Sequence, residues 1–344
     1  MKQVTLALLG FGNVGQAFIR LIQAKKAVLE NDFGLEFIVT GIFTAHHGAA
    51  IDSAGIDLTR ALELMESGQS LDLLTSQPAP SNGVDFIYAC SAQVLLENTP
   101  VNHQTGQPAI SHLQAALNKG MHAITANKGP VVYAYRDLSA QAAAQGKRFL
   151  FESAVMDGAP VFSLFRGPLP AVDVLGFRGI LNSCTNLLLE RMESGESFDA
   201  AVNYARSIGI AETDPSADVD GWDSAIKVAA LATVLMGIPL TPRQVEREGI
   251  RAITPQMLDE ARAAGERWKL VCSARRRGGQ ILEARVHPER VRPDSPLYTI
   301  SGTSSYVQFE LDVLPGLGIV ESNPGPETTA YGLLADLLNA LCGK

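Results

Sequence analysis

The sequence contains few cysteines, no long apolar run and no excess of basic residues. Its four cysteines are scattered along 344 residues without a CxxC pair. This pattern excludes a disulfide framework or a cysteine zinc site and favours a reducing compartment. No segment reaches the roughly 18 consecutive apolar residues of a membrane span, and the N-terminal apolar stretch is too short for a signal peptide. These absences predict a cytoplasmic protein that does not bind a membrane.

The charge balance excludes a further class of partner. The formal net charge of −8 disfavours nucleic acid and anionic lipid as partners. The one basic run, Arg275–Arg277, precedes two glycines, and we predict it to be a solvated hairpin tip. An apolar content of 46% and a charged content of 19% are typical of a globular chain with a large core. The length exceeds the roughly 250 to 300 residues that one core usually supports, so two domains are predicted.

The first 43 residues contain a dinucleotide-binding pattern. Val4–Leu9 is a continuous apolar run, typical of a strand buried on both faces of a parallel sheet. GFGNVG follows directly at 10–15, then an amphipathic helical pattern and a second apolar run at 37–43. Such glycines permit a tight turn, the approach of a pyrophosphate and close packing of helix on strand. We therefore predict dinucleotide binding rather than a glycine turn without a ligand, with contacts from Gly10, Phe11, Gly12, Asn13, Val14 and Gly15.

The end of the second strand lacks the acid that usually binds the ribose 2′-hydroxyl. The chain reads Phe43-Thr44-Ala45-His46-His47 there. Without a carboxylate to repel a 2′-phosphate, NADP is admissible as well as NAD, and Thr44 and His46 are candidate contacts for that phosphate. Solvated loop histidines are the simpler alternative. The sequence therefore favours NADP only slightly over NAD.

Two further strands are predicted in the first domain, at Asp85–Cys90 and Met121–Ala126. Ligands in open α/β sheets lie at the carboxyl ends of the strands. We therefore expect Ser91 and the segment Thr125–Lys128 to face the cofactor, including Asn127. An exposed lysine at a strand end is ordinary, but at a nicotinamide crevice Lys128 becomes a candidate proton donor or acceptor.

The pattern changes after residue 150. Apolar stretches at 175–181, 269–274, 281–287 and 307–313 predict half-buried strands of a mainly antiparallel sheet. The last helix begins at Gly325-Pro326-Glu327-Thr328, a small-residue start that suits a return to the cofactor. We predict an α/β fold with a Rossmann-type parallel sheet in residues 1–150, completed by 321–344. An α+β domain for substrate binding and catalysis would occupy residues 151–320.

The most charged segment of the second half is AETDPSADVDGWDSAIK at 211–227. If a helix begins after Val219, Asp223 and Lys227 form an i,i+4 pair on one face. The apolar residues from Ala225 to Ala232 predict that this helix is buried, and buried charges require partners. A surface salt bridge is the simpler alternative.

Taken in order, these motifs resemble homoserine dehydrogenase. The resemblance is carried by GFGNVG at 10–15, TANKGP at 125–130, ESAVMDGAP at 152–160, GILNSCTN at 179–186, the acidic segment at 211–227 and GPETTAYGLLADL at 325–337. It implies NAD(P)-dependent interconversion of L-homoserine and L-aspartate 4-semialdehyde in threonine and methionine biosynthesis. It also implies a homodimer formed by the sheet of the second domain.

The resemblance also implies roles for individual residues. Lys128 and Lys227 would be the catalytic lysines, with Asp223 beside the second; which lysine relays the proton stays open. Glu212 and Asp218 would hold the substrate, in a site that also includes Cys184 and Thr185. The dinucleotide motif would be joined in cofactor binding by Thr44, Ser91, Thr125, Asn127, Lys128, Gly325, Glu327 and Thr328. A monovalent cation, Na⁺ or K⁺, would be held by Glu152, Val155, Asp157 and Ala159.

The sequence departs from the family pattern in two places. Cys184 replaces a threonine of the usual Asn-Gly-Thr-Thr-Asn loop, and Met156-Asp157 is bulkier and more charged than the usual small residues. A related dehydrogenase of another small amino alcohol or semialdehyde is therefore an alternative. A non-catalytic dinucleotide sensor is another, although such a protein has no need of Lys128, Asp223 and Lys227 together. We also expect no C-terminal ACT regulatory domain, and hence no threonine feedback through one.

Overall fold

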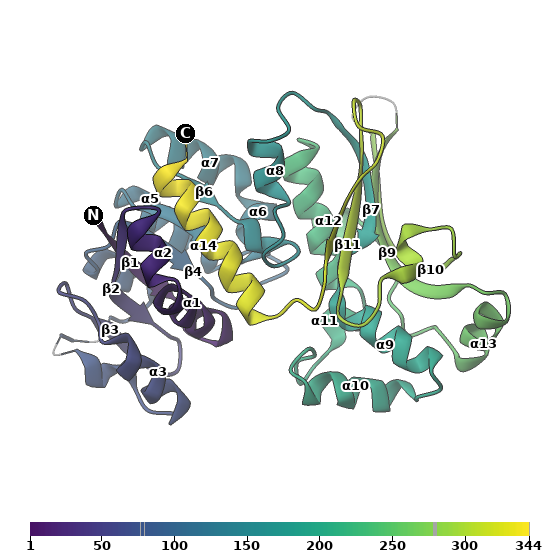
Figure 1. Cartoon of the computed structure of the whole chain (residues 1–344), viewed down its shortest axis with the longest axis horizontal. Helices are drawn as coiled ribbons and strands as arrows, with labels where there is room; N and C mark the ends of the chain where they lie inside the picture. The colour runs from purple at the N-terminus through teal and green to yellow at the C-terminus, as the bar shows by residue number, and fades with distance from the viewer. Residues whose placement is uncertain (76, 79, 278–280, 344) are drawn as a thin grey trace. The chain divides into compact units, whose positions relative to one another are not determined.

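The chain divides into two units, and the whole of unit 2 is inserted between two segments of unit 1. The computed structural model describes residues 1–75, 77–78, 80–277 and 281–343. Unit 1 contains Met1–Pro160 and Gly325–Lys344, and unit 2 contains Val161–Pro324. The chain thus leaves unit 1, builds the whole of unit 2 and returns to unit 1 with its last helix (Figure 1).

Unit 1 is built on a six-stranded sheet with the order β3-β2-β1-β4-β5-β6. Neighbouring strands are parallel, except that β3 runs antiparallel to β2. The strands are β1 (Lys2–Leu9), β2 (Leu35–Phe43), β3 (Ala49–Ile51), β4 (Val94–Glu97), β5 (His122–Thr125) and β6 (Phe149–Leu150). The order reverses between β1 and β4, and in such sheets ligands bind at this switch point, outside the carboxyl ends of the strands.

The helices of unit 1 cover this sheet. They are α1 (Asn13–Ala24), α2 (Lys26–Asn31), α3 (Leu58–Glu66), α4 (Gly83–Ala89), α5 (Ala109–Asn118), α6 (Lys128–Tyr133), α7 (Tyr135–Ala144) and α14 (Pro326–Cys342), with short 3₁₀ turns η1 (Leu71–Leu74) and η2 (Glu152–Ala154). Figure 1 shows α14 beside α1. Phe18 of α1 and Leu333 and Leu337 of α14 share one buried core with Leu6 and Leu8 of β1. The predicted parallel-sheet domain is confirmed, and α14 completes its core.

The segment predicted as a strand at Asp85–Cys90 is a helix, α4. Its aromatic and β-branched residues favour a strand by composition alone. The side chain of Asn82 overrides that preference, because its oxygen accepts the backbone N–H groups of Val84 and Asp85 at 2.9 and 3.0 Å and caps the helix. Phe86 is then fully buried. The strand that follows in the sheet is β4.

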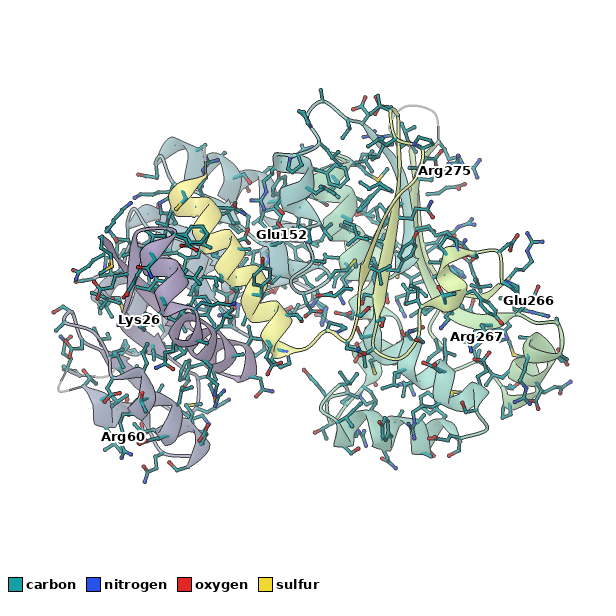
Figure 2. The ribbon with its side chains drawn as sticks, in the orientation of Figure 1. Lys26, Arg60, Glu152, Glu266, Arg267 and Arg275 are labelled. Carbon is teal, nitrogen blue, oxygen red and sulfur yellow. The ribbon has the colours of Figure 1, made fainter. Side chains whose placement is uncertain are left out.

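Unit 2 contains a second six-stranded sheet, with the order β12-β11-β7-β9-β10-β8. Neighbours are antiparallel except for the short β8, which pairs in parallel with β10. The strands are β7 (Val174–Ile180), β8 (Glu246–Arg247), β9 (Arg267–Arg277), β10 (Ile281–Val291), β11 (Ser305–Leu311) and β12 (Leu317–Glu321). The predicted, mainly antiparallel sheet is confirmed. Arg275, labelled in Figure 2, lies near the end of β9. The basic run Arg275–Arg277, predicted as a solvated hairpin tip, forms the last residues of β9 and pairs with β10; Arg275 and Arg277 are exposed and Arg276 is half-buried. Residues 278–280, which follow, lie outside the described part of the chain.

The helices of unit 2 include two that pack on this sheet, α9 and α12. The helices are α8 (Phe162–Arg166), α9 (Ser183–Glu193), α10 (Phe198–Ser207), α11 (Ser216–Val219), α12 (Trp222–Leu235) and α13 (Pro255–Ala263), with 3₁₀ turns η3 (Pro242–Gln244) and η4 (Pro296–Thr299). Helix α12 is buried along most of its length, as its apolar sequence predicts. Among the helices described, none combines the length and apolarity needed to cross a membrane.

Candidate active site

The glycine turn after β1 forms one part of the candidate site. Gly10 has a φ of +93°, and a Cβ there would lie 2.5 Å from the carbonyl oxygen of Asn98, so only glycine fits. A Cβ on Gly15 would lie 2.8 Å from the Gly10 carbonyl oxygen. At Gly12, by contrast, no described atom lies within 4 Å of the Cβ position. The N-terminus of α1 is therefore open where a pyrophosphate would approach its backbone N–H groups.

The side chain of Asn98 is a second sign of a ligand at this turn. Asn98 follows β4, and its backbone N–H donates to the Leu9 carbonyl at 2.7 Å, which places it beside Gly10. Both polar atoms of its side chain are buried and bond to no described residue. Buried amides are normally satisfied. The residues of this turn therefore fit a bound dinucleotide, and Asn98 is a candidate contact that the misplaced strand at 85–90 hid from sequence reasoning.

A polar network joins the carboxyl ends of β4 and β5. Glu97 is fully buried and accepts the Thr125 hydroxyl at 2.7 Å and the Thr99 backbone N–H at 3.1 Å. Asn127 caps α6 by accepting the Gly129 N–H at 2.9 Å, and its amide donates to the Thr99 carbonyl at 3.1 Å. The predicted residues Thr125 and Asn127 are thus held rigidly at this edge of the sheet. Glu97 was missed, although a lone acid ending an apolar strand is a signal that sequence reasoning can use.

Lys128 is the first residue of α6 and is half-buried. A lysine at a helix N-terminus adds positive charge to the positive end of the helix dipole, so helix stability does not explain it. Its position immediately after the carboxyl end of β5 does suit contact with a bound cofactor or substrate.

Ser91 lies near the amino ends of the strands, opposite the carboxyl ends where a cofactor would bind. The prediction that Ser91 directly follows a strand is wrong. It precedes β4, and Gln93 donates its backbone N–H to the Thr5 carbonyl at 2.8 Å. Because β1 and β4 are parallel, Ser91 is close to their amino ends. Its carbonyl accepts the Thr40 hydroxyl at 3.2 Å, which is a structural contact.

A carboxylate from a distant part of the sequence lies against the turn after β2. Thr44 builds the turn, because its hydroxyl accepts the His47 N–H at 2.7 Å and donates to the Gly48 carbonyl at 3.1 Å. His46 is exposed. Asp72 of η1 accepts the Ala49 N–H at 2.8 Å and so lies against this turn. An acid from a later segment therefore lies beside the turn that follows β2.

The segment after β6 has an unusual backbone and is joined to α14. Met156 and Asp157 have φ angles of +57° and +45°, in the left-handed region that non-glycine residues seldom adopt. The Asp157 carboxylate accepts the Thr329 hydroxyl at 2.5 Å. A Cβ on Gly158 would lie 2.4 Å from the Thr328 carbonyl oxygen. The segment and the first turn of α14 therefore fit each other closely.

The predicted cation ligands lie in this same segment. Glu152, labelled in Figure 2, is buried, as are Val155 and Ala159. The backbone N–H of Glu152 donates to Asp336 of α14 at 2.6 Å. Within the described part of the chain, no group of three or more His, Cys, Asp or Glu side chains is placed to hold a metal ion. A cation here would therefore have to take backbone oxygens.

At the start of α14, Gly325, Glu327 and Thr328 lie within unit 1, the unit that also contains the glycine turn. The Thr328 hydroxyl accepts the Gly325 N–H at 2.8 Å and closes the first turn. Glu327 is exposed in that turn.

Unit 2 contributes a buried acid–lysine cluster. The Lys227 ammonium lies 3.0 Å from the Asp223 carboxylate, and each side chain is only 14% exposed. The same ammonium donates to the Leu181 carbonyl at 2.6 Å. Asn182 donates its side-chain amide to Asp218 at 2.6 Å and to Asp223 at 2.9 Å. The predicted i,i+4 pair is therefore confirmed, and it is part of a cluster rather than a surface salt bridge.

Cys184 and Thr185 complete this cluster at the start of α9. Thr185 is fully buried and donates its hydroxyl and its N–H to the side-chain oxygen of Asn182, at 2.9 and 2.8 Å. Burial raises the pKa of the Cys184 thiol far above its usual range, and the charge of Asp218, to which the thiol donates, raises it further. Cys184 is therefore a neutral donor to Asp218.

Glu212 is the predicted substrate residue that the structure does not bring into the cluster. It is exposed in the loop before α11, and its carbonyl accepts the Arg206 guanidinium at 3.3 Å. Asp218, Asp223 and Lys227 belong with it to unit 2, whereas Lys128 belongs to unit 1.

A glycine turn open to a pyrophosphate, together with a buried acid–lysine cluster, defines the class as a dinucleotide-dependent oxidoreductase. Comparison with known families agrees. Residues 10–152 match the family model for the homoserine dehydrogenase NAD-binding domain, and residues 160–338 match the model for homoserine dehydrogenase. The chain belongs to the homoserine dehydrogenase family and is an NAD(P)-dependent oxidoreductase.

Individual relatives are similar over nearly their whole length. A homoserine dehydrogenase of Methanocaldococcus jannaschii is 35% identical over 97% of both chains. An NAD(+)-dependent homoserine dehydrogenase of Pseudomonas canavaninivorans is 33% identical over 98% of this chain and 96% of its own. Among solved structures, a putative homoserine dehydrogenase of Archaeoglobus fulgidus is 28% identical with a TM-score of 0.84, over 97% of this chain and 98% of its own. A hyperthermophilic archaeal homoserine dehydrogenase in complex with NADPH is 26% identical with a TM-score of 0.82, over 99% of this chain and 98% of its own.

Proposed function

We propose that the chain interconverts L-homoserine and L-aspartate 4-semialdehyde with Lys128 and Lys227 as its proton-handling residues. The buried Asp223–Lys227 pair is the observation that carries this proposal. A structural ion pair has no need of a second acid, yet Asp218 lies within reach of the same Asn182 amide. A substrate with an ammonium group and a reacting hydroxyl requires both an acid to bind the first and a base to receive the proton of the second.

The reaction separates a hydride from a proton. When bound, the nicotinamide exchanges the hydride with the C4 carbon of the substrate. The hydroxyl proton passes to a lysine that has first released its own proton to solvent and is a neutral amine. We assign this step first to Lys227, which Asp223 and the Leu181 carbonyl hold in one position. In the opposite direction the lysine ammonium returns the proton to the carbonyl oxygen of the semialdehyde. Lys128 is assigned to the same reaction from its position after β5.

The substrate ammonium is assigned to the carboxylates of Asp218 and Glu212. Asp218 is already oriented by the Asn182 amide, whereas Glu212 is exposed on a loop and would approach the substrate from there. Cys184 and Thr185 form the wall of this site at the start of α9.

The cofactor is assigned to the glycine turn, the strand ends at Thr125 and Asn127, and the start of α14. We propose a slight preference for NADP, because residues 43–47 contain no carboxylate to repel a 2′-phosphate. The carboxylate of Asp72 beside the turn acts in the opposite direction and limits this preference.

A monovalent cation, Na⁺ or K⁺, is assigned to Glu152, Val155, Asp157 and Ala159.

The assembly is proposed to be a homodimer formed through the sheet of unit 2, in the cytoplasm. The free state of all four cysteines, Cys90, Cys184, Cys272 and Cys342, supports a reducing compartment.

A steady-state assay with L-homoserine tests the proposal. The purified protein is assayed with NADP and with NAD by the absorbance of the reduced cofactor, beside Lys227→Ala and the matched surface variant Lys25→Ala. We expect Lys227→Ala to lose at least about 100-fold in kcat while cofactor binding is kept, and Lys25→Ala to behave as the wild type. Full activity of Lys227→Ala would contradict the assignment.

Cys184 supports a second candidate, a dehydrogenase of another small amino alcohol. The thiol is a weaker and larger hydrogen-bonding group than a threonine hydroxyl, and it contacts the acid assigned to the substrate ammonium. If turnover of L-homoserine is poor and Cys184→Thr restores it, the native substrate is a different amino alcohol.

A further inference from the structure

Asn182 has an orientation that its neighbours determine completely. Its side-chain oxygen must face the Thr185 N–H at 2.8 Å, because a backbone N–H can only donate. The side-chain NH₂ group therefore faces the two carboxylates, at 2.6 Å from Asp218 and 2.9 Å from Asp223. Its two hydrogens correspond to its two acceptors. Since the residue is only 4% exposed, water does not replace either bond readily.

This arrangement does more than cap α9. Capping requires only the side-chain oxygen, which serine, threonine or aspartate supplies equally well. Both hydrogens of an amide are needed only where two acceptors must be held at a fixed separation. The two carboxylates come from different helices, α11 and α12, which are separated by Gly221 with a φ of +79°. The amide therefore connects two acids that lie on different helices.

The titratable groups around the amide come from three helices and a strand. Asp218 lies on α11, and Asp223 and Lys227 lie on α12. Cys184 of α9 donates its thiol to Asp218, and Cys272 of β9 lies within the fields of Lys227 and Asp223, with a pKa that burial raises to about 11. Both thiols are neutral near pH 7. Besides the thiols, the titratable groups around Asn182 are thus two carboxyl groups and one lysine.

We propose that Asn182 is a positioning residue for the reaction. Its uncharged amide holds Asp218 and Asp223 close together while both stay ionised, so that Asp223 serves Lys227 and Asp218 serves the substrate ammonium. This inference relies on the roles proposed above for Lys227 and Asp218.

The variant Asn182→Ser separates positioning from capping. Serine caps α9 as well as asparagine does but is too short, and has too few hydrogens, to join the two acids. We expect kcat/KM for L-homoserine to fall by about 10- to 100-fold, with a lower kcat and a higher KM, because hydrogen bonds to charged groups are the strong ones. The Kd for the dinucleotide, measured directly, should stay within about twofold, since its glycine turn lies in unit 1. The melting temperature shows that the fold is kept.

Asn182→Asp provides a second and independent readout. It also keeps the cap, but it places a third carboxylate where the amide stood. Like charges raise each other's pKa, so the acid limb of the kcat/KM profile should move to higher pH by about one unit or more. A variant that merely lost a cap would lower the melting temperature without moving this limb.

Two controls make the outcomes distinguishable. Asn82→Ser makes the same change at the cap of α4, far from the acids in sequence, and should leave the kinetics and pH profile unchanged. Lys227→Ala tests the proposed function itself. If Lys227→Ala loses activity while both Asn182 variants keep wild-type kcat, KM and pH profile, the positioning role is overturned and the proposed function stands. If Lys227→Ala keeps its activity, the proposed site is wrong.

Discussion

Lys269 shows how strongly a single residue can be affected by its surroundings in this molecule. It lies on β9, only 2% exposed, and its ammonium donates to Asn186 at 2.8 Å and to the Ile300 carbonyl at 2.6 Å. Burial lowers its pKa from 10.5 to about 8, against the opposing effect of Glu190. The chain keeps a costly buried charge here because the same ammonium joins α9 to the segment around residue 300.

This shift predicts a pH dependence of stability. The folded state binds the Lys269 proton less tightly than the unfolded chain. Below about pH 8 the lysine is charged in both states, so it adds no pH dependence. Between pH 8 and 10.5 the unfolded chain still binds the proton, so the free energy of unfolding rises with pH.

The variant Lys269→Met should lack this rise. Between pH 7 and 9 the wild type should gain about 1 kcal/mol more than the variant in free energy of unfolding. Urea titrations followed by tryptophan fluorescence measure it, because both tryptophans, Trp222 and Trp268, lie in unit 2. Because both proteins contain the same four cysteines, the contribution of thiol ionisation to the pH dependence cancels in this comparison. Identical pH dependence in the two proteins would contradict the shift.

The cysteines differ sharply in predicted reactivity. Cys342 is exposed, whereas Cys90, Cys184 and Cys272 are buried. Burial raises the pKa of Cys90 to about 12 and that of Cys272 to about 11, and only the thiolate is a nucleophile. With an aromatic disulfide reagent at pH 8, we expect one equivalent of rapid reaction in the native protein and four after denaturation. Cys342→Ser should abolish the rapid phase; a remaining rapid thiol would show that a buried cysteine is accessible.

At the scale of single elements, the sequence predicts the secondary structure correctly only where neighbouring residues all favour the same conformation. The apolar run Val4–Leu9, the glycines of residues 10–15 and the amphipathic pattern after them predict strand, turn and helix correctly, because the three patterns in this order fit one another. The segment Asp85–Cys90 is predicted incorrectly, because its aromatic and β-branched residues favour a strand although it forms a helix. Only the Asn82 cap decides between them, and a single cap residue is a weak signal in isolation.

The glycine turn yields a prediction that separates folding from binding. Gly12→Ala meets open space at an ordinary φ of −75°, so stability should change by no more than about 1 kcal/mol while the dinucleotide binds at least about tenfold more weakly. Gly10→Ala meets the Asn98 carbonyl at a φ of +93° and should destabilise unit 1 by about 2 kcal/mol or more. Melting temperature and cofactor Kd measure the two effects. Equal loss of stability in both variants would show that Gly12 is also structural.

At the scale of the whole molecule, the order of the motifs was more informative than any one of them. Both sheets and the buried Asp223–Lys227 pair were predictable, because periodicity and i,i+4 spacing are local properties. Asn98 and Asp72 were not, since each becomes part of a site only when distant segments meet. Glu97 was missed, although an acid at the end of an apolar strand is a local signal. The bridge made by Asn182 depends in the same way on three separate helices.

The proposed homodimer is tested at this scale. Light scattering during gel filtration should give twice the chain mass of 36.7 kDa. Leu175 of β7 is 37% exposed on the sheet of unit 2, and Leu175→Asp should shift the protein toward monomer if that sheet forms the interface. The matched change Leu73→Asp, at a residue of unit 1 that is 68% exposed, should leave the mass unchanged. A wild-type monomer would contradict the dimer.

The return of the chain to unit 1 has a consequence for the order of synthesis. Helix α14 supplies Ala330, Leu333, Leu334 and Leu337 to the core that also contains α1 and β1. The ribosome makes all of unit 2 between these parts. The part of unit 1 that is made first, Met1–Pro160, must therefore wait, with an apolar surface uncovered, while unit 2 emerges and has the opportunity to fold first. The part of the enzyme that begins the chain is the last to be finished.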